Sequence, residues 1–429
     1  MKAIGLDIGT TSVCGIVIDA QSGIVLKKEE KANNSWLDSD KQWEKAQDPN
    51  TILSVVQEIL ESLFDETVVS IGVTGQMHGI VYLNAAGEPV SPLYTWQDER
   101  GNLPYQDTTY AAALNSYTGY GYVTHFYNKQ NGLVPDEATV FCTIHDYVAM
   151  KIAQQTKPVI HASDAASFGQ FDIERCVFTA DDPLLPAIVP DYTKIGTYKG
   201  ATVSVAIGDN QASFMGSVCG SDSVLVNAGT GSQVSVVTKK AVATTGIEIR
   251  PYIENQYLMV GCSLCGGKAF AVLENFLRET VSLMTGSPCA PLYDVMNRLL
   301  ATTEASSVTV DTRFLGTREE PNLCGSITGL RADTFSPIEL LHGTVNGMAN
   351  ELYSLFNRMN SSCKALVGSG NGIRKNAAFA KALSDTFNAS LKIPLHKEEA
   401  SFGAALFSLV TANIYPCIED AQKIIQYEV

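Results

Sequence analysis

One short pattern occurs twice in this 429-residue chain, and it constrains the fold more than any other feature. Residues 2–19 contain two apolar runs around a small polar turn, and residues 223–238 repeat that arrangement. A further predicted strand follows each pair, at 24–31 and at 256–264. Apolar runs that flank a short glycine-containing turn are typical of β-hairpins. A hairpin followed by a third strand in each half therefore indicates a duplicated domain.

The length of the chain agrees with a duplication, since roughly 150 residues per domain predicts two or three domains. Residues 179–199 are rich in proline and aspartate and have the character of an approach to a linker. We therefore expect an N-terminal domain over residues 1–203 and a C-terminal domain over residues 204–429.

The two hairpin turns have the chemistry of phosphate-binding loops. The first reads Gly9-Thr10-Thr11-Ser12 and the second Gly229-Thr230-Gly231-Ser232. Each offers a glycine for close approach, several backbone N–H groups and side-chain hydroxyls, which together can cradle a phosphate. Asp7 ends the strand before the first turn, where a carboxylate suits a Mg²⁺ ion bound mostly through waters. The alternative is an ordinary hairpin with a surface aspartate.

A carboxylate with neighbouring amides stands before the second hairpin. Residues 205–212 read VAIGDNQA, which predicts a strand end, a tight turn and a helix start. Asp209 is expected at or near the N-cap, where free backbone N–H groups favour a carboxylate. An aspartate in this position can also face a cleft and accept a proton from a substrate hydroxyl. The alternative is that Asp209 only caps the helix.

Further polar residues gather after short apolar runs. Residues 68–73 form a predicted strand that ends in TGQMHG at 74–79, the end at which open α/β sheets place ligands. Trp96, Gln97, Asp98 and Arg100 together can hydrogen-bond a polyol and stack on its apolar face. Taken separately, each of these side chains is equally compatible with a solvated loop or a satisfied core group.

Several helix signals complete the prediction. Helices are expected after Asp48-Pro49, after Ser336-Pro337 and from about Asn376, since these residues are suited to helix starts. The helix after Ser336 should bury one apolar stripe, made up of Leu341, Val345, Met348, Leu352 and Phe356.

Three other stretches have simpler expectations. The helix at 142–152 carries His145-Asp146-Tyr147, for which we expect packing or capping roles, and residues 164–171 are expected to form a turn leading into a strand. A helix of small residues at 400–409 is expected to pack beside the glycine-rich loop at 368–372.

Composition narrows the possible partners and compartment. The formal charge is −15, from 45 acidic against 30 basic residues, which argues against nucleic acid or an anionic membrane as a partner. A nucleotide ligand would have to be held by backbone N–H groups and a metal ion rather than by a field of lysines. No apolar run reaches the roughly 18 residues of a membrane span, and the N-terminus lacks a signal-peptide core.

The cysteines point to a reducing environment. There are ten, and the single C-x-x-C pair, Cys262 and Cys265, has no second pair at zinc-ligand spacing. Buried thiols and a cytoplasmic location are expected.

Taken in order along the chain, these stretches resemble the FGGY carbohydrate kinases of the actin-like ATPase superfamily. The matching segments begin at Gly5, Gly75, Trp96, Gly208, Asn227, Gly368 and Phe402, and read GLDIGTTS, GQMHG, WQDER, GDNQA, NAGTGS, GSGNG and FGAAL. They cover nearly the whole chain and are specific as a set. The chain departs from the usual pattern in its second turn, Gly-Thr-Gly where Thr-Ser is commoner, and at Ser369, where glycine is usual.

The resemblance implies a fold and an activity. The fold would be α/β, with two duplicated RNase H-like domains, each a mixed sheet flanked by helices, and a cleft between them. The activity would be ATP-dependent and Mg²⁺-dependent phosphorylation of the terminal hydroxyl of a ketose. Stretches such as TIHDYVA from Thr143 and ASDAASFGQFD from Ala162 resemble the branch that acts on sedoheptulose. Xylulose, or another pentulose or polyol, is the alternative substrate.

The resemblance also implies roles for individual residues. The N-terminal domain would bind the sugar and carry the first phosphate loop, and the C-terminal domain would carry the base and bind the nucleotide. Asp209 would be the general base, and Asp7 and Asp209 would lie near Mg²⁺. The phosphates and nucleotide would meet Thr10, Thr11, Ser12, Thr230, Gly231, Gly267, Gly370, Asn371 and Asn376. The sugar would meet Gln76, His78, Trp96, Asp98, Arg100 and Asn210.

A different class stays open, because actin-like folds also serve as chaperones, filaments and sugar-responsive regulators. A catalytically inactive sugar sensor would keep the ligand site but would have no need of the base. The presence of Asp209 beside Asn210, together with Asp7, favours the enzyme. The expected partners are a small sugar and ATP, with no nucleic acid or membrane, and a homodimer is left open.

Overall fold

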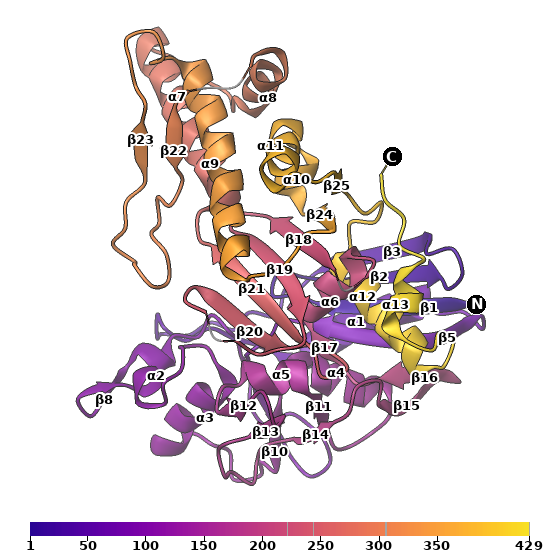
Figure 1. Cartoon of the computed structure of the whole chain (residues 1–429). Coiled ribbons are helices and arrows are strands. Elements are labelled where there is room, and N and C mark those ends of the chain that lie inside the picture. The colour runs from indigo at the N-terminus through magenta and orange to yellow at the C-terminus, as the bar shows by residue number, and fades with distance from the viewer. Residues whose placement is uncertain (221, 243, 305–306, 429) are drawn as a thin grey trace. The chain divides into compact units, whose positions relative to one another are not determined.

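The computed structural model describes residues 1–220, 222–242, 244–304 and 307–428 and has two compact units. Its elements are labelled in Figure 1. The first unit contains Met1–Cys219, Arg250–Gln256 and Glu398–Gln426. The second contains Gly220–Ile249, Tyr257–Lys397 and Tyr427–Val429.

The first unit is built on a mixed sheet in the order β15-β16-β5-β1-β2-β3, with β17 also pairing with β5. β2 pairs in antiparallel with both β1 and β3, whereas β1, β16 and β17 each pair with β5 in parallel. The strands are β1 (Lys2–Ile8), β2 (Ser12–Asp19), β3 (Val25–Ala32), β5 (Val68–Gly75), β15 (Lys194–Tyr198), β16 (Ala201–Ser204) and β17 (Ile207–Gly208).

The second unit is built on a sheet in the order β20-β21-β19-β18-β24-β25. β18, β19 and β21 form an antiparallel meander, and β24 pairs in parallel with both β18 and β25. The strands are β18 (Ser223–Ala228), β19 (Ser232–Thr238), β20 (Ile247–Pro251), β21 (Tyr257–Ser263), β24 (Ala365–Ser369) and β25 (Leu391–Lys392). The order β21-β19-β18-β24-β25 repeats β3-β2-β1-β5-β16, with the same strand directions. The predicted duplication, with a mixed sheet in each half, is therefore confirmed.

The remaining elements are helices and short paired strands. The helices are α1 (Pro49–Leu63), α2 (Tyr110–Ala113), α3 (Gly121–Gln130), α4 (Ile144–Ile152), α5 (Ala162–Ser167), α6 (Asp209–Ser217), α7 (Gly266–Thr285), α8 (Tyr293–Thr302), α9 (Pro337–Arg358), α10 (Asn371–Arg374), α11 (Ala377–Phe387), α12 (Glu399–Thr411), α13 (Ile418–Gln422) and the 3₁₀ turn η1 (Arg100–Asn102). The short strand pairs are β4 (Ala46–Gln47) with β7 (Leu93–Tyr94), β6 (Val81–Leu83) with β10 (Val140–Cys142), β8 (Pro104–Tyr105) with β9 (Thr108–Thr109), β11 (Val159–His161) with β14 (Ala187–Val189), β12 (Phe171–Asp172) with β13 (Val177–Phe178), and β22 (Thr309–Asp311) with β23 (Ser326–Thr328).

Most helix starts follow the local chemistry that predicted them. The Asp48 side chain accepts hydrogen bonds from the N–H groups of Asn50 and Thr51 at the start of α1. Ser336 accepts one from Glu339 at the start of α9, and the five residues of the predicted apolar stripe are buried. The expectation for residues 164–171 was wrong in part, because residues 162–167 form α5, which His161 caps by accepting from the N–H of Ser163.

Both faces of the sheet in the first unit are covered. Alternate residues of β1 point to opposite faces, so Ile4, Leu6 and Ile8 join a core with α1 and α4. The other face carries α12, which lies against β1, β5 and α6. A Cβ on Gly72 would lie only 1.8 Å from the carbonyl oxygen of Ala404, and one on Gly403 would lie 1.9 Å from that of Ala212. Backbone-to-backbone packing of this kind is possible only because these positions are glycines.

The predicted division at residues 203 and 204 stays a prediction about domains. In the packing described here, α6 and α12 both belong to the first unit, although they follow residue 203 in the chain. The small-residue helix was expected to pack beside the loop at 368–372. This helix is α12, and within the first unit it packs against β1, β5 and α6, which were not predicted as its partners.

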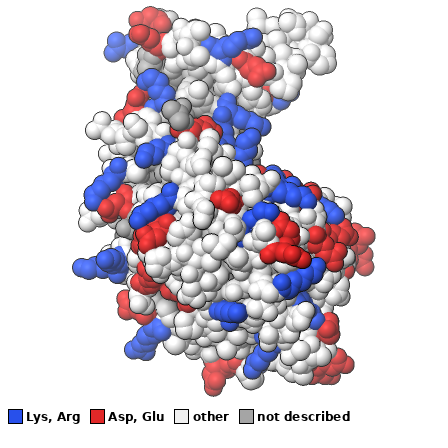
Figure 2. Space-filling model, turned by 90° about the vertical axis from the view of Figure 1, so that its right-hand side faces the viewer, with Lys and Arg blue, Asp and Glu red and all other residues white. Residues whose placement is uncertain are grey.

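The surface carries charges of both signs. On the face drawn in Figure 2, lysine and arginine side chains are interspersed with aspartate and glutamate. Among the helices of the described residues, none is long and apolar enough to cross a membrane.

The close packing of α12 leads to a stability prediction. We expect Gly72→Ala to lower the free energy of unfolding by about 3 kcal/mol or more, because the new methyl overlaps a backbone carbonyl that cannot move alone. Chemical denaturation of the full chain measures this change. Gly229→Ala is the control, since its Cβ would meet nothing closer than the Gly231 carbonyl oxygen at 3.8 Å. Equal unfolding midpoints for the two variants would contradict the packing.

Candidate active site

Strand register brings two aspartates to one edge of the first unit's sheet. Asp7 on β1 is paired with Thr74 on β5, and Thr74 is paired on its other side with Ile207 of β17. The Thr74 hydroxyl also donates to the carbonyl oxygen of Ile207, with an oxygen–oxygen distance of 2.7 Å. Asp209 follows Ile207 by two residues, so Asp7 and Asp209 emerge together at the carboxyl ends of parallel strands. Ligands bind at this edge in open α/β sheets.

Asp209 is the first residue of α6, and Gly208 is its N-cap. This agrees with the prediction that it lies at or near the cap. The side chain is half-buried, and its Oδ1 accepts a hydrogen bond from Asn210 Nδ2 at 3.1 Å. The positive end of the helix dipole favours a carboxylate here, and the contact with the Asn210 amide helps to hold its orientation.

Burial disfavours the ionised form of both carboxylates. It raises the pKa of Asp7 to about 7, and repulsion from Asp209 contributes to that increase. Burial also raises the pKa of Asp209, although Asn210, Arg250 and His145 act in the opposite direction. Two neighbouring carboxylates with raised pKa values form an oxygen-donor pair suited to a divalent cation. Within the described residues, no group of three or more His, Cys, Asp or Glu side chains is arranged to hold a metal ion.

A buried histidine interacts electrostatically with both aspartates. This residue was expected to have a packing or capping role, and its ion pair with Asp164 was not predicted. His145 on α4 places Nε2 2.9 Å from Oδ1 of Asp164 on α5, and both side chains are 0% exposed. Burial lowers the pKa of His145, but Asp164, Asp146 and Asp209 outweigh burial and raise it to about 9. The expected capping role holds for the neighbouring Asp146, which pairs with Thr143. Nothing in the sequence connects positions 145 and 164, because the fold alone makes them neighbours.

The first hairpin turn is tied to two of the predicted sugar-binding residues. The Thr10 hydroxyl donates to Gln76 Oε1 at 3.2 Å and accepts from Trp96 Nε1 at 3.0 Å. Gln47, which was not predicted, donates to the Thr10 carbonyl and accepts from Gln76 Nε2, both at 2.9 Å. Trp96 stays 46% exposed, so a face of its ring is open to a ligand. The structure thus groups Thr10, Gln76 and Trp96.

The other predicted residues near this turn have distinct surroundings. Thr11 is exposed, and the Ser12 hydroxyl donates to Glu30 at 3.2 Å. His78 adopts a left-handed backbone with φ of 72° and stacks on Tyr120 with ring centroids 4.4 Å apart. The Nδ1 atom of His78 lies 2.8 Å from the Ser167 carbonyl oxygen, and the backbone N–H of His78 donates to the Ser167 hydroxyl. These contacts fix the imidazole in one orientation.

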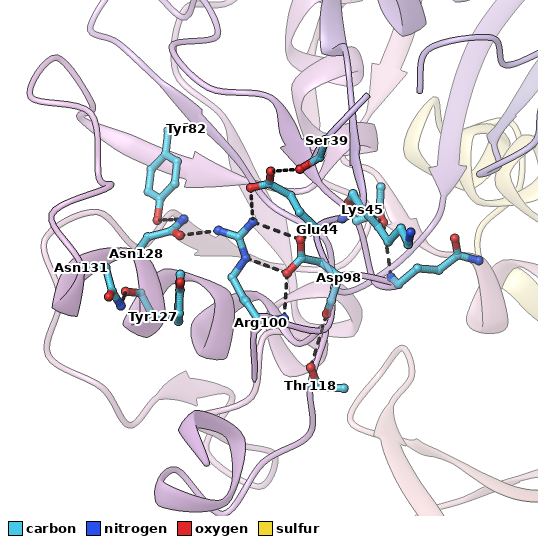
Figure 3. Close-up of polar contacts among 12 residues, drawn as sticks. Ser39, Glu44, Lys45, Tyr82, Asp98, Arg100, Thr118, Tyr127, Asn128 and Asn131 are labelled. Atoms are coloured by element: carbon cyan, nitrogen blue, oxygen red, sulfur yellow. Dashed lines mark hydrogen bonds and ion pairs between the residues drawn. The ribbon is translucent and has the colours of Figure 1, made fainter. Parts of the chain in front are cut away.

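Asp98 and Arg100 are at the centre of a buried network (Figure 3). Arg100 donates from Nε to Asp98 Oδ1 at 2.6 Å and from Nη2 to Oδ2 at 3.0 Å, and the side chains are 1% and 0% exposed. Arg100 also donates to Asn128 and to Glu44, and its guanidinium lies 4.0 Å from the ring centroid of Tyr94. Direct contact between these two side chains and a sugar stays a prediction, which their burial does not support. Their contacts instead hold the loop that carries Trp96.

The second unit contains a cavity of about 920 Å³ beside its hairpin turn. Four of the residues predicted for the nucleotide line it: Thr230, Gly267, Asn371 and Asn376. Gly231 and Gly370 border the same turn. The Gly231 carbonyl accepts from the Gly229 N–H, and Gly370 has φ of 84° with no room for a Cβ beside Ala228.

Sequence reasoning missed several other residues of this cavity. Lys268 and Phe270 follow the predicted Gly267 on α7, so their place in the chain was a usable signal. Tyr293 and Asn297 on α8, and Lys375 after α10, carry no such signal, since tertiary structure brings them there. The Phe270 and Tyr293 rings pair with centroids 6.1 Å apart, which provides an aromatic wall.

Comparison with known proteins agrees with this geometry. Family models for the N-terminal and C-terminal domains of the FGGY family of carbohydrate kinases match residues 2–185 and 224–412. The chain therefore belongs to the FGGY family of carbohydrate kinases, and it is a sugar kinase. The predictions of the family and of a sugar kinase are confirmed.

Individual relatives cover nearly the whole chain. Sedoheptulokinase of Mus musculus is 27% identical over 95% of this chain and 97% of its own length. Xylulose kinase of Staphylococcus epidermidis is 22% identical over 97% of this chain and 89% of its own. The structure of Plasmodium falciparum glycerol kinase with ADP superposes with a TM-score of 0.80 at 16% identity, over 99% of this chain and 92% of that one. This likeness confirms the predicted actin-like fold.

The Arg100 network leads to a second stability prediction. We expect Arg100→Gln to lower the free energy of unfolding by about 3–5 kcal/mol, because Asp98 is left buried without its cation. Denaturant unfolding measures the effect. The control is Lys381→Gln, which breaks the exposed pair with Asp385 and should cost no more than about 0.5 kcal/mol. An Arg100→Gln protein with unaltered stability but lost sugar binding would support the direct contact instead.

Proposed function

We propose that this chain transfers the γ-phosphoryl group of ATP to the terminal hydroxyl of a ketose, with sedoheptulose as the first candidate and sedoheptulose 7-phosphate as the product. The observation that carries the proposal is that strand register places Asp7 and Asp209 at the same edge of the sheet in the first unit. Phosphoryl transfer requires mainly positioning and neutralisation of charge. A base on a rigid helix start beside a second carboxylate suits that requirement.

In this proposal Asp209 is the general base. Its half-buried carboxylate accepts the proton of the attacking hydroxyl, and its raised pKa brings its basicity closer to that of a useful base at neutral pH. Asn210 orients it, and His145, which is paired with Asp164, acts to lower the pKa of Asp209.

The sugar is assigned to the group around the first hairpin turn. Gln76, His78 and Asn210 offer polar atoms, and the open face of Trp96 suits the C–H face of a sugar. Asp98 and Arg100 are buried and so cannot reach a sugar at the surface; their role is to position the loop that carries Trp96. Thr10, Thr11 and Ser12 are assigned to the transferring phosphate.

ATP is assigned to the cavity of the second unit. Its volume of about 920 Å³ is within the usual range for ligand pockets. A Cβ on Gly267 would lie 2.4 Å from the Gly229 carbonyl oxygen, so the glycine allows the helix start and the turn to meet. Thr230, Gly231, Gly370, Asn371 and Asn376 complete the assignment. The ADP in the glycerol kinase of similar fold supports a nucleotide role.

Asp7 and Asp209 would hold Mg²⁺, because they are oxygen ligands whose mutual repulsion a divalent cation relieves. The ion, when bound, neutralises charge on the transferring phosphate.

Support for sedoheptulose comes from similarity to the mouse sedoheptulokinase over 95% of this chain. Xylulose is the alternative, since the xylulose kinase of S. epidermidis is 22% identical over 97% of the chain. Initial rates with seven-carbon and five-carbon ketoses separate the two, and a higher kcat/KM for xylulose would decide for the alternative.

Removal of the base gives a direct test of mechanism. We expect Asp209→Asn to lose on the order of 10²–10⁴ in kcat, as for loss of a general base. ATP affinity should persist, because the cavity assigned to ATP contains no part of α6. A coupled assay of ADP formation measures turnover. Asp385→Asn, on the exposed surface, should behave as wild type. Undiminished turnover of the Asp209 variant would remove the assigned role.

Metal dependence can be tested separately. We expect chelation of divalent ions to abolish turnover and added Mg²⁺ to restore it. In Asp7→Asn, half-maximal rate should require at least about ten-fold more Mg²⁺, because one anionic oxygen ligand is lost. A titration of rate against free Mg²⁺ measures the shift. An identical titration curve for wild type and variant would argue that Asp7 is no ligand.

A further inference from the structure

The cavity of the second unit has a charge balance opposite to that of the chain. Its charged lining residues are Lys268, Lys375 and Asp294, two cations to one anion. Over the whole chain, 45 acidic residues outnumber 30 basic ones. A net positive lining in an acidic protein favours an anionic ligand at this place.

The start of α7 does not supply that positive character through free N–H groups. The Gly266 N–H donates to the Ser263 hydroxyl at 3.0 Å, and the Ala269 N–H to the Cys265 carbonyl at 2.8 Å. The Gly267 N–H donates to the Gly229 carbonyl at 3.2 Å, and the Lys268 N–H to the Thr230 carbonyl at 3.0 Å.

Two of these four bonds, those of Gly267 and Lys268, hold the helix start against the hairpin turn, and the other two lie within residues 263–269. All four occupy N–H groups that a phosphate would otherwise use at a helix N-terminus. The sequence predicted that backbone N–H groups and a metal ion, rather than lysines, would hold a nucleotide. At this helix start the N–H groups already have partners within the chain.

Lys268 can supply, through its side chain, the positive charge that the bonded N–H groups do not offer to a ligand. Its backbone is held by Thr230, the hydroxyl residue of the turn, while its side chain is exposed on the cavity wall. Lys375 lines the same cavity, and its N–H is held by the Asn371 carbonyl at 3.1 Å. An ammonium group binds phosphate oxygens as a mobile point charge and makes charge-assisted hydrogen bonds.

We infer that Lys268 binds the polyphosphate of the nucleotide, with Lys375 as a second contact. This inference rests on the proposed function, which assigns ATP to this cavity. The ligand class is a nucleoside di- or triphosphate, recognised by an aromatic wall at Phe270 and Tyr293 and by the two ammonium groups. Lys268 should thus contribute to the affinity for ADP and ATP but not for the bare nucleoside.

Calorimetric titration of the full chain with adenosine, AMP, ADP and ATP tests this, with Mg²⁺ present throughout. We expect Lys268→Gln to weaken ADP and ATP binding by roughly five- to ten-fold, because a charge-assisted contact is lost, and to leave adenosine binding unchanged. Lys268→Arg should retain most of the affinity, since the charge is kept. Lys375→Gln should show a smaller loss with the same dependence on phosphate number. Raising the salt concentration should weaken ATP binding to wild type more than to Lys268→Gln.

The control is Lys240→Gln, an exposed lysine of the same unit that does not line the cavity, and it should match wild type. Equal ATP affinity for wild type and Lys268→Gln would overturn the inference and leave the kinase assignment intact. An equal loss for adenosine and ATP would also overturn it, since phosphate would then play no part. Wild-type protein that binds none of the adenine ligands would instead remove the nucleotide from this cavity, and the inference with it.

Discussion

The parallel pairing of β5 with β1 on one side and with β17 on the other is the constraint on which the first unit depends. It sets Asp7, Thr74 and Ile207 at one level of the sheet, so that the next turn delivers Asp209 to the same edge as Asp7. A shift of one residue in either register would turn one of these side chains to the opposite face. The Thr74 hydroxyl bond to Ile207 adds a side-chain link at that level.

Placing acids together in a partly buried edge has an energetic cost, and the surrounding residues reduce it. His145 provides a buried positive charge among Asp164, Asp146 and Asp209, and its pKa is raised accordingly. Further along the same unit, Arg100 satisfies Asp98, Asn128 and Glu44 at once (Figure 3). Buried ion pairs contribute little net stability, but they are costly to break. Their value here is to hold the Trp96 loop and the strand ends in one arrangement.

The second unit has the same strand topology, but different side chains surround its hairpin turn. Its turn between β18 and β19 is locked to the start of α7, and lysine side chains line the cavity beside it. In the first unit the corresponding turn bonds through Thr10 to Gln76, Gln47 and Trp96, and through Ser12 to Glu30. The duplicated framework thus carries different side chains around its two turns.

Local sequence determined the elements whose causes are local. The two hairpins, the Asp48 cap of α1, the Ser336 cap of α9 and the helix start at Asp209 all follow from neighbouring residues, and so they were predictable. The motifs in chain order were also sufficient to identify the family. The assigned ligand roles stay predictions, because they depend on molecules that act on the folded protein.

Only the tertiary structure decided which distant residues meet. It seated α12 on β1 and β5 through glycines, paired His145 with Asp164, and turned Asp98 and Arg100 inward on each other. It also brought Tyr293, Asn297 and Lys375 to one cavity wall. Hydrogen-bonding and capping preferences act over a few residues and leave a trace in the sequence. Burial, charge pairing and close backbone contact depend on neighbours in space, which a single sequence does not reveal.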